Sequence, residues 1–170
     1  MSSMDMERTL VMDAVTVERK IQRIAHEIFE NNFEESCINF MGIEKRGFAL
    51  AEQIATLYEG ISGQEVKIWS VPILKRNPMQ SFQIEGLPDG GLKDKVVVLV
   101  DDVLNSGRTL IYAAKHILNE EVRCLQTVCL VDRKHRKYPI RADYVGMTLG
   151  TTLQEHIAVE FDDEIKVYLD

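Results

Sequence analysis

The stretch VVVLVDDVLNSGRT, from Val96 to Thr109, decides the fold class of this chain. It opens with an unbroken apolar run, Val96–Val100, which is typical of a central parallel strand covered on both faces. Two acids, Asp101 and Asp102, follow at the carboxyl end of that strand, where open α/β sheets bind their ligands. The stretch therefore predicts a strand, a turn and a helix, with a binding site where the strand ends.

Strands and helices alternate on both sides of this stretch. Apolar residues spaced by three and four predict an amphipathic helix from Asp13 to residue 31 or 32, on the stripe Val17, Ile21, Ile24 and Ile28. We also expect a second helix from Gly47 to Gly60, a third over 109–119, strands at 37–41, 66–71 and 125–131, and short β segments over 143–146, 156–161 and 165–169. This alternation predicts one α/β domain over residues 1–170, with a mostly parallel central sheet, helices on both faces and a small C-terminal β hood.

Charge and cysteine content restrict the kind of protein. The chain has 20 Lys and Arg against 27 Asp and Glu, a net charge of −7, which argues against binding nucleic acid or anionic lipid with the whole surface. No stretch approaches the roughly 18 consecutive apolar residues of a membrane span, and Met1–Val11 lacks the apolar run of a signal peptide. Cys37, Cys124 and Cys129 lack CxxC spacing, and Cys37 and Cys124 sit among apolar residues, which predicts buried thiols in a reducing compartment and hence a cytoplasmic protein. Residues 1–12 show no periodicity and predict a loose arm.

Residues 72–94 interrupt the alternation. They contain three of the four prolines of the chain and three glycines, and a gap of this length in a compact domain is usually a functional loop or a disordered one. The apolar side chains between these prolines could instead anchor the segment to the body of the protein. We expect a split outcome, in which Phe82–Ile84 is packed and Leu74–Gln80 is mobile.

The turn Asn105–Thr109 has the composition of a phosphate site. Backbone N–H groups at a helix start, the hydroxyls of Ser106 and Thr109, and the positive end of the helix together attract an anion. Gly107 permits close backbone approach and a positive φ. The preceding acid pair suits a polyhydroxyl sugar or its Mg²⁺, because carboxylates accept hydrogen bonds from vicinal hydroxyls and bind that ion. Taken piecemeal, the same residues could be ordinary strand-end acids and a helix cap.

The apolar strand, the Asp-Asp pair and the Ser-Gly-Arg-Thr turn together resemble the signature with which type I phosphoribosyltransferases bind phosphoribosyl pyrophosphate (PRPP). Within that superfamily the sequence is most similar to the PyrR proteins, which are uracil phosphoribosyltransferases and pyrimidine-operon attenuation regulators. Four segments look like PyrR segments in the same order, namely Arg23–Glu27, Gly42–Gly47, Asp101–Thr109 and Leu130–Gly146. The likeness covers most of the chain from residue 13 onward and implies the type I phosphoribosyltransferase fold.

The resemblance implies roles for the residues of the central stretch. Asp101 and Asp102 would be catalytic, face the ribose 2′- and 3′-hydroxyls, and contact a Mg²⁺ ion that is held mainly by PRPP and water. The 5-phosphate is expected on the residues of the turn, Asn105, Ser106, Gly107, Arg108 and Thr109. Arg108 could instead be structural and pair with a neighbouring carboxylate.

The same resemblance implies three further parts of the site. The pyrophosphate loop would consist of Glu44, Lys45, Arg46 and Gly47, with Lys45 and Arg46 as catalytic cations beside the leaving group. An ordinary strand–helix connection with two solvated cations is the alternative. Lys75 and Arg76 would belong to a lid over pyrophosphate, although the acids that follow the arginine in PyrR proteins are absent here. The base hood would consist of Asp132, Arg133, Pro139 and Ile140, for which a charged surface loop is the alternative.

The implied activity is a Mg²⁺-dependent transfer of phosphoribose from PRPP to a nucleobase, with uracil as the first candidate, by a homodimer or higher homo-oligomer. One alternative is an RNA-binding regulator that senses nucleotides through its PRPP pocket, with RNA contacts at His26, His135, Arg136 and Arg141. Against it, Gln22 and Met147 stand where the RNA-binding members commonly carry Thr and Lys. A nucleotide-binding protein without catalysis is the third hypothesis, because residues 72–94 depart from the family pattern.

Overall fold

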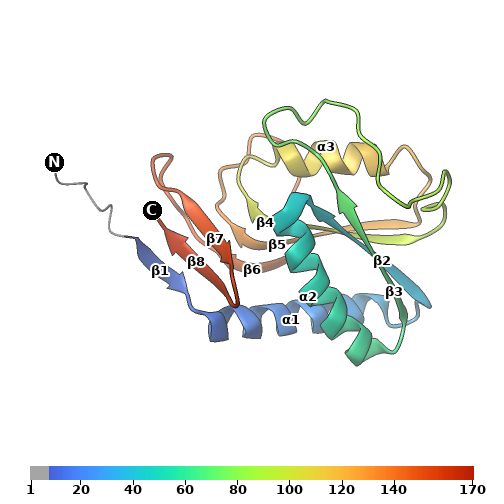
Figure 1. The fold of residues 1–170 in the computed structure, drawn as a ribbon, viewed down its shortest axis with the longest axis horizontal. Coiled ribbons are helices and arrows are strands. Elements are labelled where there is room, and N and C mark those ends of the chain that lie inside the picture. Colours follow the sequence, from blue (N-terminus) through green and yellow to red (C-terminus); the bar gives the residue numbers. More distant parts are fainter. Residues whose placement is uncertain (1–7) are drawn as a thin grey trace.

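A parallel sheet of five strands, in the order β3-β2-β4-β5-β6, lies at the centre of the computed structural model, which describes residues 8–170 (Figure 1). Its strands are β2 (Cys37–Ile43), β3 (Glu65–Val71), β4 (Val96–Leu104), β5 (Cys124–Asp132) and β6 (Tyr144–Thr148). All neighbouring pairs in this sheet are parallel, and β4 pairs with β5 from Val96 opposite Cys124 to Leu104 opposite Asp132. The predicted α/β fold with a parallel central sheet is confirmed.

Helices cover both faces of this sheet, and they are α1 (Ala14–Asn32), α2 (Glu44–Ser62) and α3 (Arg108–Ile117). α1 and α2 lie on one face and α3 lies on the other (Figure 1). Along β4, Val96, Val98 and Val100 pack toward α1 and α2, whereas Val97 and Leu99 pack toward α3. A strand buried on both faces is apolar throughout, which explains why the run 96–100 predicts its position correctly.

The amphipathic pattern of α1 is also confirmed. The carboxylate of Asp13 caps this helix by accepting a hydrogen bond from the N–H of Thr16 at 2.8 Å. The predicted stripe is at most 1% exposed and consists of Val17, Ile21, Ile24 and Ile28. These side chains fix α1 against the sheet and leave its opposite face to solvent.

An antiparallel sheet in the order β1-β8-β7 lies at the end of the molecule where β4 and β5 terminate (Figure 1). Its strands are β1 (Thr9–Met12), β7 (Ile157–Phe161) and β8 (Ile165–Leu169). β7 and β8 match the predicted C-terminal β segments, whereas β1 joins them from the other end of the chain. The prediction of a loose arm over 1–12 is therefore wrong for Thr9–Met12, because β1 pairs with β8 and Arg8 bonds to Glu160 at 2.6 Å and to Asp170 at 2.7 Å. Residues 1–7 of that arm lie outside the described residues.

Two element boundaries differ from the prediction where the candidate site lies. β2 runs to Ile43 and α2 begins at Glu44, so the helix expected from Gly47 starts earlier. Glu44 has a positive φ of 52°, and this left-handed conformation lets the chain pass from strand to helix within one residue. β4 likewise continues past Val100 to Leu104, so both acids belong to the strand.

Residues 72–95 connect β3 to β4 without a helix or strand of their own, and we call this segment the strap. The strap runs across the outer side of α3 (Figure 1). Ile73, Ile84 and Leu92 of the strap are buried, and the ring of Phe82 lies with its centroid 4.1 Å from that of His116 on α3. The Phe82–Ile84 part is therefore packed, as predicted, whereas Leu74 and Met79 in the other part are exposed.

The three cysteines are free thiols, and Cys129 is buried. The prediction of buried thiols is wrong for Cys37 and Cys124, which stay partly exposed because they are the first residues of β2 and β5. Within residues 8–170, no helix has the length and apolar character that crossing a membrane requires.

Candidate active site

The acid pair lies inside the carboxyl end of β4. Asp101 and Asp102 are 4% and 2% exposed, and Oδ1 of Asp101 accepts a hydrogen bond from the N–H of Asp102 at 2.9 Å. The Nζ atom of Lys75 lies 3.5 Å from Oδ1 of Asp101 and 3.4 Å from Oδ1 of Asp102. Arg76, next to it on the strap, is exposed. The strap thus brings one of the two predicted lid cations to the predicted PRPP acids.

Burial controls the protonation of this cluster. Removal from water raises the pKa of Asp101 well above its usual range, the neighbouring carboxylate of Asp102 adds to the rise, and the charge of Lys75 opposes it. Burial alone would lower the pKa of Lys75, but the two carboxylates outweigh that effect and raise it. The pair therefore needs a cation or a set of hydrogen-bond donors beside it when both carboxyls are ionised.

The turn from Asn105 to Thr109, which we call the phosphate turn after its predicted role, joins β4 to α3 and has the shape of an anion site. Gly107 precedes the helix with a φ of 86°, and Oγ of Ser106 accepts a hydrogen bond from the N–H of Arg108 at 3.2 Å. The N–H groups of the first turn of α3 point out of the helix start, directly after the acid pair. The structure therefore brings all the predicted PRPP residues together at one helix N-terminus.

Gly107 is required by a close contact as well as by its φ. A Cβ atom at this position would lie 2.8 Å from Cγ2 of Ile140. The carbonyl of Ser106 accepts hydrogen bonds from the N–H groups of Lys137 at 2.8 Å and Tyr138 at 3.2 Å. The β5–β6 loop (residues 133–143) therefore packs directly on the phosphate turn and carries the predicted hood residue Ile140 with it, while its neighbour Pro139 is exposed.

The N-terminus of α2 approaches the acid pair through Gly47. A Cβ atom at Gly47 would lie 2.7 Å from the carbonyl oxygen of Val100, so only glycine allows the helix to come this close to β4. Lys45 and Arg46 are exposed in the first turn of the same helix. The predicted pyrophosphate residues thus lie on the first turn of α2 instead of on a loop, because the left-handed Glu44 completes the turn alone.

A cavity of about 530 Å³ lies between this first turn of α2 and the strap. It is lined by Ile43–Arg46, Ser70 and Pro72–Lys75. Oε1 of Glu44 accepts a hydrogen bond from the backbone N–H of Lys75 at 3.2 Å and so ties the strap to the helix. Lys45 and Arg46 line this cavity beside a single carboxylate, that of Glu44, and the helix N-terminus adds partial positive charge, so the lining favours an anion. Lys75 also lines the cavity and adds to this balance when its ammonium leaves the acid pair.

Arg133 is 8% exposed and uses every nitrogen of its guanidinium for hydrogen bonds within the protein. Nη1 donates to Oδ1 of Asn105 at 2.9 Å, and Nε donates to Oγ1 of Thr151 at 2.8 Å. Nη2 donates to the carbonyls of Thr152 at 3.2 Å and Glu155 at 2.5 Å. The side chain therefore joins the phosphate turn to the β6–β7 loop (residues 149–156).

Asp132 ends β5 with both carboxylate oxygens engaged. Oδ1 accepts a hydrogen bond from the N–H of Lys134 at 2.9 Å, and Oδ2 lies 3.3 Å from Nη2 of Arg136. The side chain is 4% exposed. The predicted hood residues thus all lie at the end of β5 or in the loop that follows it.

The β6–β7 loop is the part of the site that the sequence did not predict. Besides the bonds from Arg133, the carbonyl of Thr151 accepts a hydrogen bond from Nε2 of His135 at 2.5 Å. Leu153 in this loop is 86% exposed, which is unusual for a large apolar residue. No motif marks the loop in the sequence, and the apolar Leu153 between polar neighbours, Thr152 and Gln154, is a signal that could have drawn attention to it.

The residues matched to RNA contacts come from two elements. His26 is exposed on α1, and Arg141 is exposed in the β5–β6 loop. His135 and Arg136 lie in the same loop, but their side chains bond to Thr151 and Asp132. Two of the four residues therefore take part in the packing around the hood.

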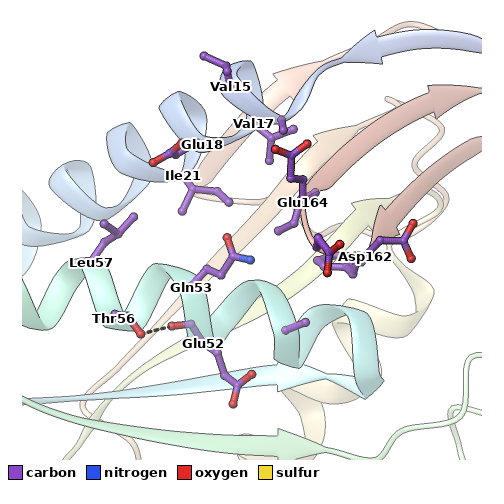
Figure 2. Close-up of a pocket in the computed structure, with 15 residues that line it drawn as sticks. Val15, Val17, Glu18, Ile21, Glu52, Gln53, Thr56, Leu57, Asp162 and Glu164 are labelled. Atoms are coloured by element: carbon purple, nitrogen blue, oxygen red, sulfur yellow. Dashed lines mark hydrogen bonds between the residues drawn. The ribbon is translucent and has the colours of Figure 1, made fainter.

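A separate groove of about 590 Å³ lies between α1, α2 and the turn that joins β7 to β8 (Figure 2). Acidic side chains from all three elements line it, including those of Glu18, Glu52, Asp162 and Glu164 (Figure 2). Such walls repel a polyphosphate, and none of the predicted PRPP residues is among the lining residues. This groove is larger than the cavity at the start of α2, but its charge has the wrong sign for the predicted substrate.

A divalent ion at the acid pair would depend on its substrate for most ligands. Within residues 8–170, no group of three or more His, Cys, Asp or Glu side chains is arranged to hold a metal ion. Asp101 and Asp102 supply two carboxylates, and Mg²⁺ usually keeps several waters and binds through one or two carboxylates plus substrate phosphates. The residues present therefore fit a Mg²⁺ ion that arrives with a phosphorylated substrate.

Comparison with known proteins relates most of this chain to one family. The family model described as the phosphoribosyl transferase domain matches residues 11–164. The bifunctional protein PyrR of Clostridium acetobutylicum is 37% identical, with 93% of this chain and 96% of that protein covered. The bifunctional protein PyrR of Geobacter sulfurreducens is 40% identical, with 91% of each chain covered.

Solved structures share the fold at much lower identity. A hypoxanthine phosphoribosyltransferase of Trypanosoma cruzi superposes with a TM-score of 0.74 at 16% identity, covering 94% of this chain and 95% of that chain. A hypoxanthine-guanine phosphoribosyltransferase of Bacillus anthracis gives a TM-score of 0.72 at 21% identity, covering 85% and 84%. These similarities support the arrangement of sheet and helices described above.

Proposed function

Because the chain belongs to the phosphoribosyl transferase domain family and, within it, to the PyrR proteins, we propose that it transfers the phosphoribosyl group of PRPP to uracil with Mg²⁺, giving uridine monophosphate and pyrophosphate. One observation carries the proposal. The buried acids Asp101 and Asp102 directly precede a phosphate turn at the start of α3 and face Lys75 on their other side. The resemblance to the PyrR proteins, at 37% and 40% identity, supports the choice of uracil over the hypoxanthine of the structural neighbours, which are 16% and 21% identical.

The acid pair and the phosphate turn hold the two ends of the ribose. Asp101 and Asp102 accept hydrogen bonds from the 2′- and 3′-hydroxyls, which relieves the repulsion between two buried carboxylates. The N–H groups at the start of α3, with the hydroxyls of Ser106 and Thr109, bind the 5-phosphate. A bound Mg²⁺ supplies electrostatic stabilisation of the pyrophosphate leaving group.

The cations around the 530 Å³ cavity receive the leaving group. Displacement of pyrophosphate builds positive charge at ribose C1 and negative charge on the departing oxygens, much as in glycoside transfer. Lys45 and Arg46 on α2, together with Lys75 on the strap, stabilise that negative charge as it develops. For this step Lys75 leaves the acid pair, whose carboxylates then bind the sugar hydroxyls, and moves toward pyrophosphate.

A regulatory function is the second candidate, and one observation favours it. The PyrR relatives are called bifunctional proteins, and in this chain the basic β5–β6 loop bonds directly to Ser106 of the phosphate turn through Lys137 and Tyr138. A nucleotide phosphate would therefore bind to a turn that is bonded to the element carrying Arg141, a predicted RNA contact. A homodimer or higher homo-oligomer, a single domain and a cytoplasmic location stay predictions that follow from the resemblance and the composition.

An assay of pyrophosphate release tests the proposed function. Purified protein is incubated with Mg²⁺ and PRPP against a panel of pyrimidine and purine bases, and we expect release with uracil above all other bases. Calorimetry with Mg²⁺ and PRPP alone measures binding without turnover. Binding of PRPP without release of pyrophosphate for any base would contradict the enzymatic proposal and favour an RNA-binding regulator or a nucleotide-binding protein without catalysis. Release with hypoxanthine alone would contradict the choice of uracil.

A further inference from the structure

Arg133 connects two parts of the site that lie far apart in the sequence. On one side its guanidinium bonds to Asn105 of the phosphate turn, and on the other it bonds to Thr151, Thr152 and Glu155 of the β6–β7 loop. All three guanidinium nitrogens donate hydrogen bonds within the protein, and the residue is 8% exposed. The side chain is therefore held in place by both the phosphate turn and the β6–β7 loop.

We propose that Arg133 is a positioning residue that couples occupation of the phosphate turn to the conformation of the β6–β7 loop, and that it does not itself contact the base. The inference rests on the proposed function, in which a sugar phosphate binds the turn. A guanidinium is a rigid planar fork, so a displacement of Asn105 at one end shifts the donors at the other end. A buried donor that loses its acceptor is costly, so the two ends change together instead of separating.

The backbone around Arg133 strengthens this coupling. The N–H of Arg133 donates to the carbonyl of Leu104 at 3.0 Å, directly before the phosphate turn. Two residues further on, His135 makes a second bond to Thr151. The β5–β6 loop is thus fixed to the turn and to the β6–β7 loop at several points, and within residues 8–170 Arg133 is the only residue whose side chain bonds to both. By linkage, a ligand on either part then strengthens binding on the other by the same factor.

Hydrogen exchange with ribose 5-phosphate tests the inference without requiring the base to be known. This probe carries the sugar hydroxyls and the phosphate but has no leaving group. In the natural protein we expect it to slow exchange over both 104–110 and 149–156, the latter by at least about fivefold, a typical lower value for coupled sites. In Arg133→Gln we expect protection over 104–110 to persist and the response over 149–156 to disappear.

Three further variants separate positioning from general destabilisation. Lys134→Gln removes the same charge from the neighbouring exposed residue and should keep both responses. Arg133→Lys keeps the charge but not the fork and should not restore the response over 149–156. Thr151→Val removes a single acceptor, stays close in volume and should reduce that response, which keeps the test decisive if Arg133→Gln fails to fold.

The possible results distinguish this inference from the proposed function. Protection over 104–110 alone in the natural protein, or an unchanged response over 149–156 in both Arg133→Gln and Thr151→Val, would overturn the positioning role and leave the phosphate site intact. Protection of neither segment in the natural protein would overturn the phosphate site and the coupling with it. A lost response in Arg133→Gln or Thr151→Val, with both responses kept in Lys134→Gln, supports the proposal.

Discussion

Lys75 and Asp102 are joined across 27 positions of sequence by a contact of 3.4 Å between Nζ and Oδ1. Asp101 lies nearly as close to the same ammonium, at 3.5 Å. The lysine thus occupies the place beside the acid pair that the sugar hydroxyls take in the proposed complex. Binding of PRPP must displace Lys75, and the strap that carries it must move or adjust.

Replacement of Lys75 by Met should separate the stabilising role of this cation from its catalytic one. The Lys75 side chain is 43% exposed, so solvent screens the contact and we expect a loss of at most about 1 kcal/mol in the free energy of unfolding. We expect kcat/KM for PRPP to fall by about 100-fold, because a cation beside the leaving group is lost. Denaturant unfolding and pyrophosphate release measure the two effects. Lys93→Met, which removes an exposed lysine from the same strap, is the matched control. Unchanged kinetics in Lys75→Met would show that Lys75 takes no part in catalysis.

The double variant Asp101→Asn with Asp102→Asn should abolish turnover and leave the fold intact. Both side chains lie at the carboxyl end of β4, and their amide replacements keep similar volume and one acceptor each. We expect activity to fall by about 1,000-fold or more and PRPP binding to weaken, because two charged acceptors for the ribose are lost. Calorimetry and circular dichroism check binding and fold. Activity like that of the natural protein would exclude the acid pair as the ribose site.

The single variant Asp101→Asn should be more stable than the natural protein at neutral pH. The raised pKa of Asp101 means that the folded state holds this proton more tightly than the unfolded state, whose value is near 3.8. The protonated carboxyl of Asp101 therefore contributes its full stabilisation of the fold below about pH 3.8, and this contribution is lost as the pH rises through the pKa of the folded state. Asn stays neutral throughout, so we expect a gain in the free energy of unfolding at pH 8 that vanishes toward pH 3.5. Urea unfolding across this pH range measures it, and a gain that grows toward acid would contradict the assignment.

The sequence predicts those parts of the molecule whose chemistry is local. The apolar run before Asp101 and the helical stripe of α1 report burial directly, since each residue of the pattern has its own place in the core. The contact of Lys75 with the acid pair and the four bonds of Arg133 depend on loops whose course is set by tertiary packing. The pairing of Thr9–Met12 with β8 joins the two ends of the chain, and no local pattern specifies such a partner.

Gly107→Ala should impair phosphate binding through a steric contact. The new Cβ would lie 2.8 Å from Cγ2 of Ile140, and a φ of 86° is unfavourable for alanine. We expect the affinity for PRPP to fall about tenfold, which corresponds to about 1.4 kcal/mol. Gly90→Ala is the matched control, because Gly90 also has a positive φ, of 73°, but no atom lies within 4 Å of its added Cβ.

The combination of Gly107→Ala with Ile140→Ala tests the cause of that loss. If the contact with Ile140 is responsible, removing its side chain should recover part of the affinity, since the backbone strain alone remains. Equal affinities for the single and double variants in calorimetry would assign the whole effect to φ. An effect of Gly90→Ala as large as that of Gly107→Ala would argue against a local phosphate site.

The strap should respond to ligand in one half only. Phe82 stacks on His116 and Ile84 is 7% exposed, so this half is already anchored, whereas Leu74 and Met79 in the other half are 39% and 69% exposed. Closure of the Leu74–Gln80 half over PRPP would order the chain at about 1–2 kcal/mol per fixed residue, and the attraction between Lys75, Arg76 and pyrophosphate must offset that cost. We therefore expect Mg²⁺ and PRPP to slow hydrogen exchange over 74–80 and to leave 82–92 nearly unchanged. Phe82→Ala should loosen the anchored half in the free protein, because its ring no longer packs on α3. Strong protection over 74–80 without ligand, unchanged when PRPP is added, would identify the strap as a fixed connector and not a lid.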